Sequence, residues 1–169
     1  MDIEVEDGYR PGCIGRITEL HAGFYHRTEG FGLVFESKVA RELAEFCERY
    51  DPAFDGLWLA VVDDQTHGSI VIDGATSDGP GAHLRWYITS DATRGSGIGR
   101  KLLKTALEFC DAKRCPLVYL NTFAGLDTAR HLYEAFGFEL VEEAAGTQWG
   151  HKVIEQRFER AYSSGSNRP

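Results

Sequence analysis

Apolar residues recur along this chain with two periods, one typical of strands and one typical of helices. Alternating or continuous apolar runs predict strands over residues 14–20, 57–62, 68–72, 83–89, 116–120, 138–142 and 150–158. Apolar stripes at spacings of three and four predict helices over 35–50, 98–110 and 127–136, with a short helical or irregular piece at 24–26. Strands that alternate with helices in this order predict one mixed sheet covered by helices.

Turn and cap residues set the limits of these elements. Asp127 is expected to cap the last helix and Gly137 to end it. The glycine-rich stretch 73–81 is expected to form a loop, and the polar stretch 161–169 a disordered tail. The sequence therefore predicts a single domain over residues 9–160.

Composition fits one compact domain without a membrane or nucleic-acid partner. Of 169 residues, 43% are hydrophobic, which is enough for a sizeable core. The net charge of −8 argues against non-specific binding to nucleic acid or to an anionic membrane. No apolar run is long enough to span a bilayer, and the acidic start does not resemble a signal peptide. We therefore expect a cytoplasmic protein.

The cysteines and histidines do not form a recognisable metal site. Without an export signal the four cysteines are expected to be reduced thiols, and Cys47 and Cys110 fall on the apolar stripes of predicted helices. The six histidines show no ligand spacing. The sequence thus predicts no metal.

The most informative segment is Arg94-Gly95-Ser96-Gly97-Ile98-Gly99, between a predicted strand and a predicted helix. Glycines let a ligand approach the backbone, and N–H groups at a helix start attract phosphate. Nearby positive charge comes from Arg94, Arg100, Lys101 and Lys104. The segment favours a pyrophosphate site, although a glycine-rich turn without a ligand remains an alternative.

The spacing of this segment excludes two common phosphate motifs. A Walker loop needs GxxxxGK[ST], and a dinucleotide site needs GxGxxG early in the domain. The pattern Arg-x-x-Gly-x-Gly at Arg94, Gly97 and Gly99 instead resembles the acetyl-CoA signature of the GNAT (GCN5-related) N-acetyltransferases. Residues 129–142 are similar to the second signature of this family, A-x-x-L-Y-x-x-x-G-F. The stretch 11–158 also resembles GNAT domains found C-terminal to MarR-type regulators, and we expect this copy to stand alone.

The resemblance implies a fold and a co-substrate. The fold is an α/β (α+β) GNAT fold, with a mixed, mostly antiparallel sheet of six to seven strands, about four helices, and splayed fourth and fifth strands. The co-substrate is acetyl-CoA, with no metal, and the reaction is direct acetyl transfer to a primary amine of a small molecule or a peptide. The family also suggests a homodimer through the C-terminal strands.

The resemblance also assigns roles to individual residues. Tyr133 corresponds to the tyrosine that protonates the departing thiolate. The expected acetyl-CoA contacts are Ile88, Ser90, Arg94, Gly95, Ser96, Gly97, Ile98, Gly99, Arg100 and Asn121. Ser90 replaces the usual proline of a V-x-P pattern, and Leu126 stands where the family often has an asparagine, so Asn121 or Thr122 is the expected substitute.

The base and the acceptor pocket are not identified by the sequence. Base candidates are Glu19, Glu29, Glu36, His26 and His83, and a water chain is an alternative to all of them. His83, Arg85 and Tyr87 are expected on one face of their strand. The expected acceptor pocket holds Phe24, Tyr25, His26, Phe31 and Trp149, which would suit a small amine such as an amino acid or a polyamine, with ordinary core packing as the alternative.

Two other functions remain in competition with acetyl transfer. The missing base and Leu126 favour a non-catalytic module that binds or senses acyl-CoA, or that serves assembly, whereas Tyr133 argues for catalysis. Hydride transfer on a nicotinamide cofactor disagrees with the glycine spacing.

Overall fold

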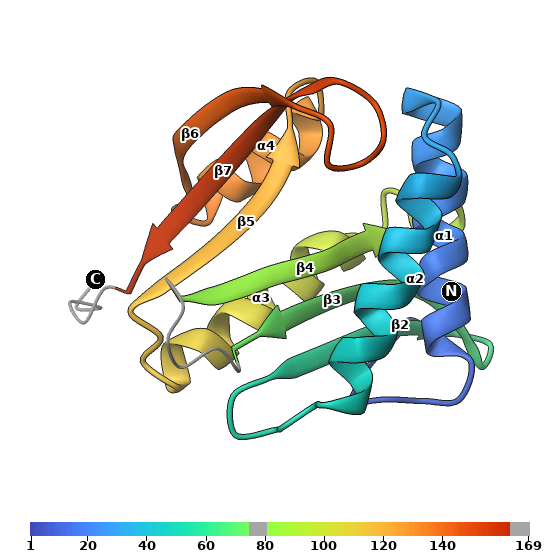
Figure 1. Cartoon of the computed structure of the whole chain (residues 1–169). Helices are drawn as coiled ribbons and strands as arrows, with labels where there is room; N and C mark the ends of the chain where they lie inside the picture. Colours follow the sequence, from blue (N-terminus) through green and yellow to red (C-terminus); the bar gives the residue numbers. More distant parts are fainter. Residues whose placement is uncertain (75–80, 163–169) are drawn as a thin grey trace.

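The computed structural model describes residues 1–74 and 81–162 (Figure 1). The strands are β1 (Glu4–Asp7), β2 (Gly56–Val62), β3 (Gln65–Asp73), β4 (Ala82–Thr89), β5 (Leu117–Phe123), β6 (Glu139–Gly146) and β7 (Val153–Ala161). The helices are α1 (Cys13–Glu29), α2 (Leu33–Glu48), α3 (Ile98–Ala112) and α4 (Asp127–Ala135), with a short 3-10 turn at Asp91–Thr93. None of the helices in the described part is long and apolar enough to cross a membrane.

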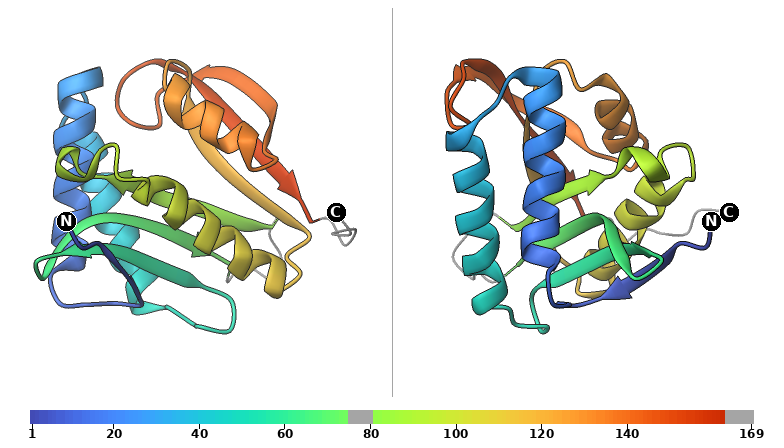
Figure 2. Two further views of the ribbon diagram at one scale, coloured as in Figure 1. Left: turned by 180° about the vertical axis from the view of Figure 1, so that it is seen from behind. Right: turned by 90° about the vertical axis from the view of Figure 1, so that its right-hand side faces the viewer.

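The strands form one sheet in the order β1-β2-β3-β4-β5-β7-β6. Every neighbouring pair is antiparallel except β4 and β5. Helices α1 and α2 cover one face, and α3 and α4 cover the other, as the view from behind shows (Figure 2). The mixed sheet between two helical layers confirms the predicted fold class.

Each helical layer encloses its own core. The core under α1 and α2 includes fully buried Leu43, Phe46 and Val71, whereas the core under α3 and α4 includes Leu102 and Phe158. Cys13 and Cys110 are buried in these two cores, one in each. The sheet thus has two apolar faces, which explains why β2 is buried along its whole length.

The two halves of the sheet separate between β4 and β5. These strands pair only at Ala82–Val118 and His83–Tyr119, and diverge beyond this point (Figure 1). The register of β3 with β4 shifts between Ser69 and Val71, so that β4 carries one extra residue there. Such a bulge bends a strand, and the positive φ of 44° at Trp86 lies in it. The splayed strands are therefore confirmed.

The expected first strand at 14–20 is wrong, because this segment lies inside α1. The buried residues of α1 are Cys13, Ile17, Thr18 and His21. Cys13, Ile17 and His21 follow one another at intervals of four residues, which is a helical spacing. The segment 24–26 belongs to the same helix. Polar side chains on the buried face of α1 make its helical period hard to recognise in the sequence. The actual first strand is β1, which pairs with β2 from Glu4 to Asp7.

Some predicted boundaries shift by a few residues. Leu126 is the N-cap of α4 and makes no side-chain capping bond, so Asp127 lies inside the first turn rather than at the cap. Gly137 follows the helix at a φ of 91°, as expected of a glycine that ends a helix. The sheet extends from β1 through Ala161. Most of the expected loop (75–80) and of the expected tail (163–169) lies outside the described residues.

Candidate active site

The glycine-rich segment forms a tight turn that leads into α3. Gly95 and Gly97 have φ values of 79° and 81°, and Gly97 is the N-cap of α3. The Ser96 hydroxyl donates to the Thr93 carbonyl at 2.5 Å and accepts from the Ile98 N–H at 3.3 Å. Side chains other than glycine would be strained at these positive φ values. The sequence motif thus fixes the local backbone.

Several N–H groups of this turn have no acceptor among the described residues. The N–H groups of Gly95, Gly97, Gly99 and Arg100 make no hydrogen bond there, whereas Lys101 N–H bonds to the Gly97 carbonyl at 3.1 Å. Donors at a helix start, with the helix dipole behind them, suit an anionic group. The structure therefore brings together the donors that the sequence predicts for a pyrophosphate.

Arg94 lies on this turn, but its charge is already paired. Its guanidinium donates to Asp91 at 2.7 Å, and Arg27 of α1 reaches the other oxygen of the same carboxylate at 3.4 Å. The side chain of Arg94 is 68% exposed. It is therefore free to exchange this surface partner for another anion at little cost.

Tyr87 connects the glycine turn with the interior of the sheet. Its hydroxyl donates to the Gly99 carbonyl at 2.6 Å. A Cβ atom at position 99 would lie 3.1 Å from the Tyr87 hydroxyl, so a larger residue there would crowd this contact. The bulge places Tyr87 toward α3 and Arg85 toward α2, so the expectation that both share one face is wrong.

Ile88 and Ser90 lie where β4 leads into the 3-10 turn. Ile88 is buried and pairs with Ser69 of β3. Ser90 donates its N–H to the His67 carbonyl at 2.7 Å, and its hydroxyl lies 2.9 Å from His67 Nδ1. These contacts anchor the end of β4 in the absence of the family's proline. Their role toward acetyl-CoA stays a prediction.

Tyr133 of α4 lies where the two halves of the sheet separate. Its ring is 6.2 Å from that of Tyr87 and 6.1 Å from that of Phe158, between ring centroids. Burial raises the pKa of Tyr133 well above its usual value, and Tyr25 and Tyr87 raise it further. Its hydroxyl has no hydrogen-bond partner among the described residues. At neutral pH this phenol holds its proton and can donate it.

A cavity of about 350 Å³ opens beside Tyr133. It lies between the β4–β5 divergence and helices α1 and α2, with the β6–β7 loop contributing Gln148 and Trp149. Its polar side chains are His21, Lys38, Glu42, His83, Arg85, Asn121, Thr122 and Gln148. A second cavity of about 140 Å³ extends from Tyr133 past Leu126 toward Gln156. Tyr133 borders both cavities, so it can meet molecules that enter from either side.

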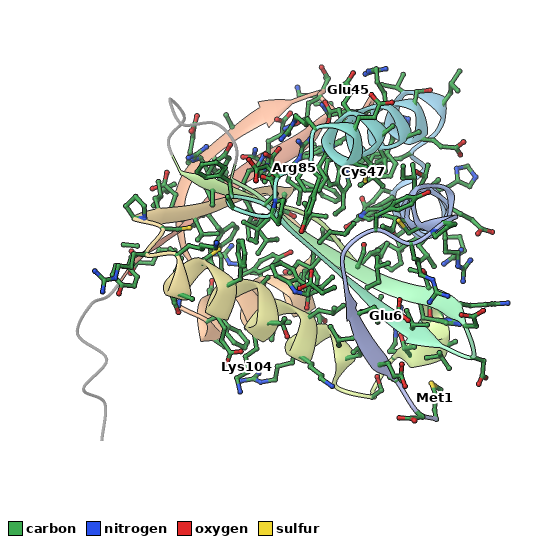
Figure 3. All side chains as sticks on the ribbon, turned by 90° about the horizontal axis from the view of Figure 1, so that it is seen from below. Met1, Glu6, Glu45, Cys47, Arg85 and Lys104 are labelled. Carbon is green, nitrogen blue, oxygen red and sulfur yellow. The ribbon has the colours of Figure 1, made fainter. Side chains whose placement is uncertain are left out.

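Five charged residues form a continuous ion-pair chain, and three of them, Lys38, Glu42 and Arg85, line the larger cavity. Glu42 accepts from Lys38 at 2.8 Å and from Arg85 at 2.7 Å, each through a different oxygen. Asp73 Oδ2 accepts from Arg85 at 3.2 Å and from Arg49 at 2.6 Å. Arg85 also lies 4.1 Å from the Trp86 ring centroid and sits in the interior beside α2 (Figure 3).

The residues expected in the acceptor pocket divide into two groups. Tyr25 and Trp149 line the larger cavity. Phe31 is buried in the core instead, stacked on Tyr25 at 6.1 Å and close to Phe123. Phe24 and His26 do not line this cavity either, so the structure brings together only two of the five residues expected in the pocket.

Among the base candidates, only His83 lines the cavity. Glu19, Glu29, Glu36 and His26 lie elsewhere. The sequence did not single out Glu42, the acidic residue in the cavity wall. Its signal was an i,i+4 pair with Lys38 beside the apolar stripe of α2. Asn121 lines the larger cavity and Leu126 lines the second one, and the role of Asn121 toward acetyl-CoA stays a prediction.

Two histidines in the cavity wall stay neutral at acid pH. Burial lowers the pKa of His21 to about 4, against which its hydrogen bond to Ile17 O at 2.8 Å acts weakly. Burial, followed by the charge of Arg85, lowers the pKa of His83 to about 3. Arg157 and Lys38 lower it further, whereas Asp73 opposes them. Burial is therefore the main reason that His83 stays neutral, and the nearby cations add to it.

The low pKa of His21 predicts acid sensitivity. An unfolded histidine takes up a proton near pH 6.5, whereas the folded His21 resists protonation until about pH 4. Its contribution to stability is therefore complete above pH 6.5 and is lost as the pH falls toward 4. Between pH 7 and pH 5 the unfolding free energy should therefore fall by about 2 kcal/mol less in His21→Asn than in the native protein. Urea titrations of both proteins at the two pH values measure it, and equal decreases would contradict the assignment.

Within the described residues no group of three or more His, Cys, Asp or Glu side chains is arranged to hold a metal ion. The candidate site brings together backbone donors, the protonated phenol of Tyr133 and a cavity with charged side chains.

Comparison with known proteins identifies the family. A family model described as the acetyltransferase (GNAT) family matches residues 17–138. Human N-acetylaspartate synthetase is 27% identical over 127 residues, which cover 75% of this chain and 42% of that protein. The spermine/spermidine N(1)-acetyltransferase of Bacillus subtilis (strain 168) is 27% identical over 116 residues, which cover 61% of this chain and 68% of that protein. This chain thus spans less than half the length of the human relative.

Solved structures share the fold. A GNAT-family acetyltransferase from Staphylococcus aureus Mu50 has a TM-score of 0.75 at 16% identity, covering 96% of this chain and 100% of that one. The yncA protein of Salmonella typhimurium, solved with its cofactor acetyl-CoA, has a TM-score of 0.77 at 14% identity, covering 100% and 99%. The family match covers most of the chain, and the two solved structures have the same fold over nearly all of its length. The chain therefore belongs to the GNAT family of acetyltransferases.

Proposed function

We propose that this chain transfers the acetyl group of acetyl-CoA to a primary amine by direct attack. The observation that carries the proposal is the link from the glycine turn to Tyr133. Tyr87 bonds to Gly99 in the turn and its ring neighbours that of Tyr133. A pyrophosphate on the turn would therefore be joined, through one side chain, to the group that can protonate a thiolate.

The glycine turn would hold the pyrophosphate through the N–H groups of Gly95, Gly97, Gly99 and Arg100. The chain from the pyrophosphate to the thioester would run into the β4–β5 divergence, past Ile88 and toward Asn121. This arrangement would bring the acetyl group beside Tyr133 and would leave the rest of the larger cavity for the acceptor. Positioning of this kind can account for a large part of the rate.

The chemistry then follows from the neighbouring groups. The acceptor ammonium first loses a proton, and its nitrogen attacks the thioester carbonyl carbon. A C–N bond forms, the C–S bond breaks, and Tyr133 gives its phenolic proton to the departing thiolate. The new amide loses its remaining extra proton to water, and Tyr133 regains one from water, so that one proton is released overall.

The relatives support acetyl transfer to an amine but differ in the acceptor. The names of the two curated relatives refer to N-acetylaspartate and to spermine or spermidine, which carry opposite charges at neutral pH. The cytoplasmic location and the homodimer stay predictions from the sequence.

A direct test combines binding with turnover. Acetyl-CoA should raise the melting temperature of the purified protein, and NADH should not. A panel of amines should then release free thiol from acetyl-CoA. Binding of acetyl-CoA without thiol release on any amine would instead favour the non-catalytic acyl-CoA module.

A glycine substitution tests the turn itself. Gly97→Ala is expected to raise the KM for acetyl-CoA about tenfold, because the added methyl strains a φ of 81° and disturbs the N–H donors. Gly12→Ala is the matched control. Gly12 is also a helix N-cap, at a φ of 89° with open space around it, so its substitution should cost similar stability. Equal effects of both substitutions on KM would contradict the proposed turn.

A further inference from the structure

The charged side chains that line the larger cavity carry a net positive charge. Its charged side chains are Lys38, Arg85 and Glu42, which gives one excess positive charge. Asp73 lies behind Arg85 and is shared with Arg49, so the ion-pair chain as a whole also has three cations and two anions. The wall therefore favours an anionic group over a second cation.

The cations in this wall still have donors to offer. A guanidinium has five N–H donors and an ammonium has three. Arg85 uses one bond to Glu42 and one to Asp73, and Lys38 uses one bond to Glu42. By contrast, each oxygen of Glu42 already accepts from a cation. An incoming carboxylate would find unused donors on two cations, whereas an incoming ammonium would find a single carboxylate, Glu42, whose negative charge is already shared between Lys38 and Arg85.

Arg85 is held in place before any ligand arrives. Two carboxylates and the Trp86 ring fix its guanidinium, and its side chain is only 20% exposed. A cation that is fixed and partly shielded from water binds an anion more strongly than a mobile surface cation does. The bulge in β4 produces this placement, because it directs Arg85 toward α2 while Tyr87 faces the glycine turn.

A polyamine would meet an unfavourable field in the same space. His83 in the cavity wall is neutral, because burial and then the charge of Arg85 lower its pKa to about 3, and a neutral ring offers an ammonium no negative charge. Each positive charge of a polyamine would lose water beside Lys38 and Arg85 without gaining a free carboxylate.

We infer that the acceptor of this acetyltransferase is a small amine that carries a carboxylate, bound by Arg85 and Lys38. The inference rests on the proposed function. The amine of this acceptor points toward Tyr133, at the other end of the cavity. A cavity of about 350 Å³ agrees with a small acceptor.

The test compares acceptors that differ only in the carboxylate. L-Leucine, L-methionine and L-phenylalanine are assayed beside their α-carboxamides, with L-aspartate and spermidine in the same panel. We expect kcat/KM for at least one amino acid to exceed that of its amide about tenfold or more, and spermidine to be the poorest substrate. Spermidine as the best substrate, or equal rates for acids and amides, would overturn the inference and leave acetyl transfer intact.

Removing the charge of Lys38 tests whether this residue binds the carboxylate of the acceptor. Lys38→Met keeps the length and helix preference of the side chain, and it should raise the KM for the amino acid about tenfold while the KM for its amide and for acetyl-CoA stays unchanged. Lys113→Met, at the end of α3, is the control for loss of one positive charge and should leave all three KM values unchanged. Equal changes for acid and amide in Lys38→Met would overturn the role of Lys38.

Calorimetry separates this inference from the proposed function. Each amino acid and its amide are titrated into the protein saturated with CoA. Tighter binding of the acids without any thiol release would overturn acetyl transfer while retaining the carboxylate site. No binding and no turnover of any acid in the panel would overturn the carboxylate site.

Discussion

Replacing Tyr133 with phenylalanine is expected to lower kcat about a hundredfold and to leave the affinity for acetyl-CoA nearly unchanged. The phenol has no hydrogen-bond partner among the described residues, so its loss removes a proton donor and little else. Phenylalanine fills the same space between Tyr87, Phe138 and Phe158. Steady-state thiol release measures kcat, and titration with acetyl-CoA measures the affinity.

The control separates chemistry from packing. Tyr50→Phe removes a phenol that packs on Phe46 outside both cavities, and it should leave kcat unchanged. The melting temperature of Tyr133→Phe should stay close to that of the native protein. An unchanged kcat in Tyr133→Phe would show that another group, or water, protonates the thiolate.

Periodicity predicted the elements whose buried faces are apolar and failed where they are polar. Helices α2 and α3 bury stripes such as Val39–Leu43 and Leu102–Ala106, whose spacing is visible in the sequence. Helix α1 buries His21, a polar residue that hides the helical period behind an apparent alternation. Strand β1 has only four residues, three of them acidic, so its alternation of apolar and polar residues is too short to be recognised in the sequence.

Local motifs predicted the glycine turn and singled out Tyr133 as a candidate, because each motif depends on neighbours in sequence. The cavity wall depends on contacts between distant segments and could not be predicted in this way. Glu42 meets Arg85 across 43 positions, and the bulge in β4 decides which way Arg85 faces. Besides the spacing of Lys38 and Glu42, the sequence held one signal for this wall: Arg85 lies between the apolar residues Leu84 and Trp86, and an arginine in an apolar stretch needs a buried partner.

Asp73→Asn is expected to lower the free energy of unfolding by about 3 kcal/mol at pH 7, because it leaves Arg85 and Arg49 without their shared carboxylate. Burial by itself would raise the pKa of Asp73, but the hydrogen bonds and charges of Arg49 and Arg85 outweigh it, so the pKa lies below its usual value. Asp64→Asn is the control. Asp64 is an exposed partner of Arg10 at a positive φ that asparagine tolerates, so its substitution should barely change stability.

The depressed pKa fixes how this difference depends on pH. An aspartate that ionises more readily in the folded state than in the unfolded state stabilises the fold above the unfolded pKa of about 3.9. That stability is lost as the pH falls through the lower, folded value. Urea titrations should therefore give a constant difference between native protein and Asp73→Asn from pH 7 to about pH 5, and a shrinking one below about pH 4. A difference that shrank already between pH 7 and pH 5 would mean that Asp73 is protonated there, and the ion-pair chain could not then hold Arg85 in the cavity wall.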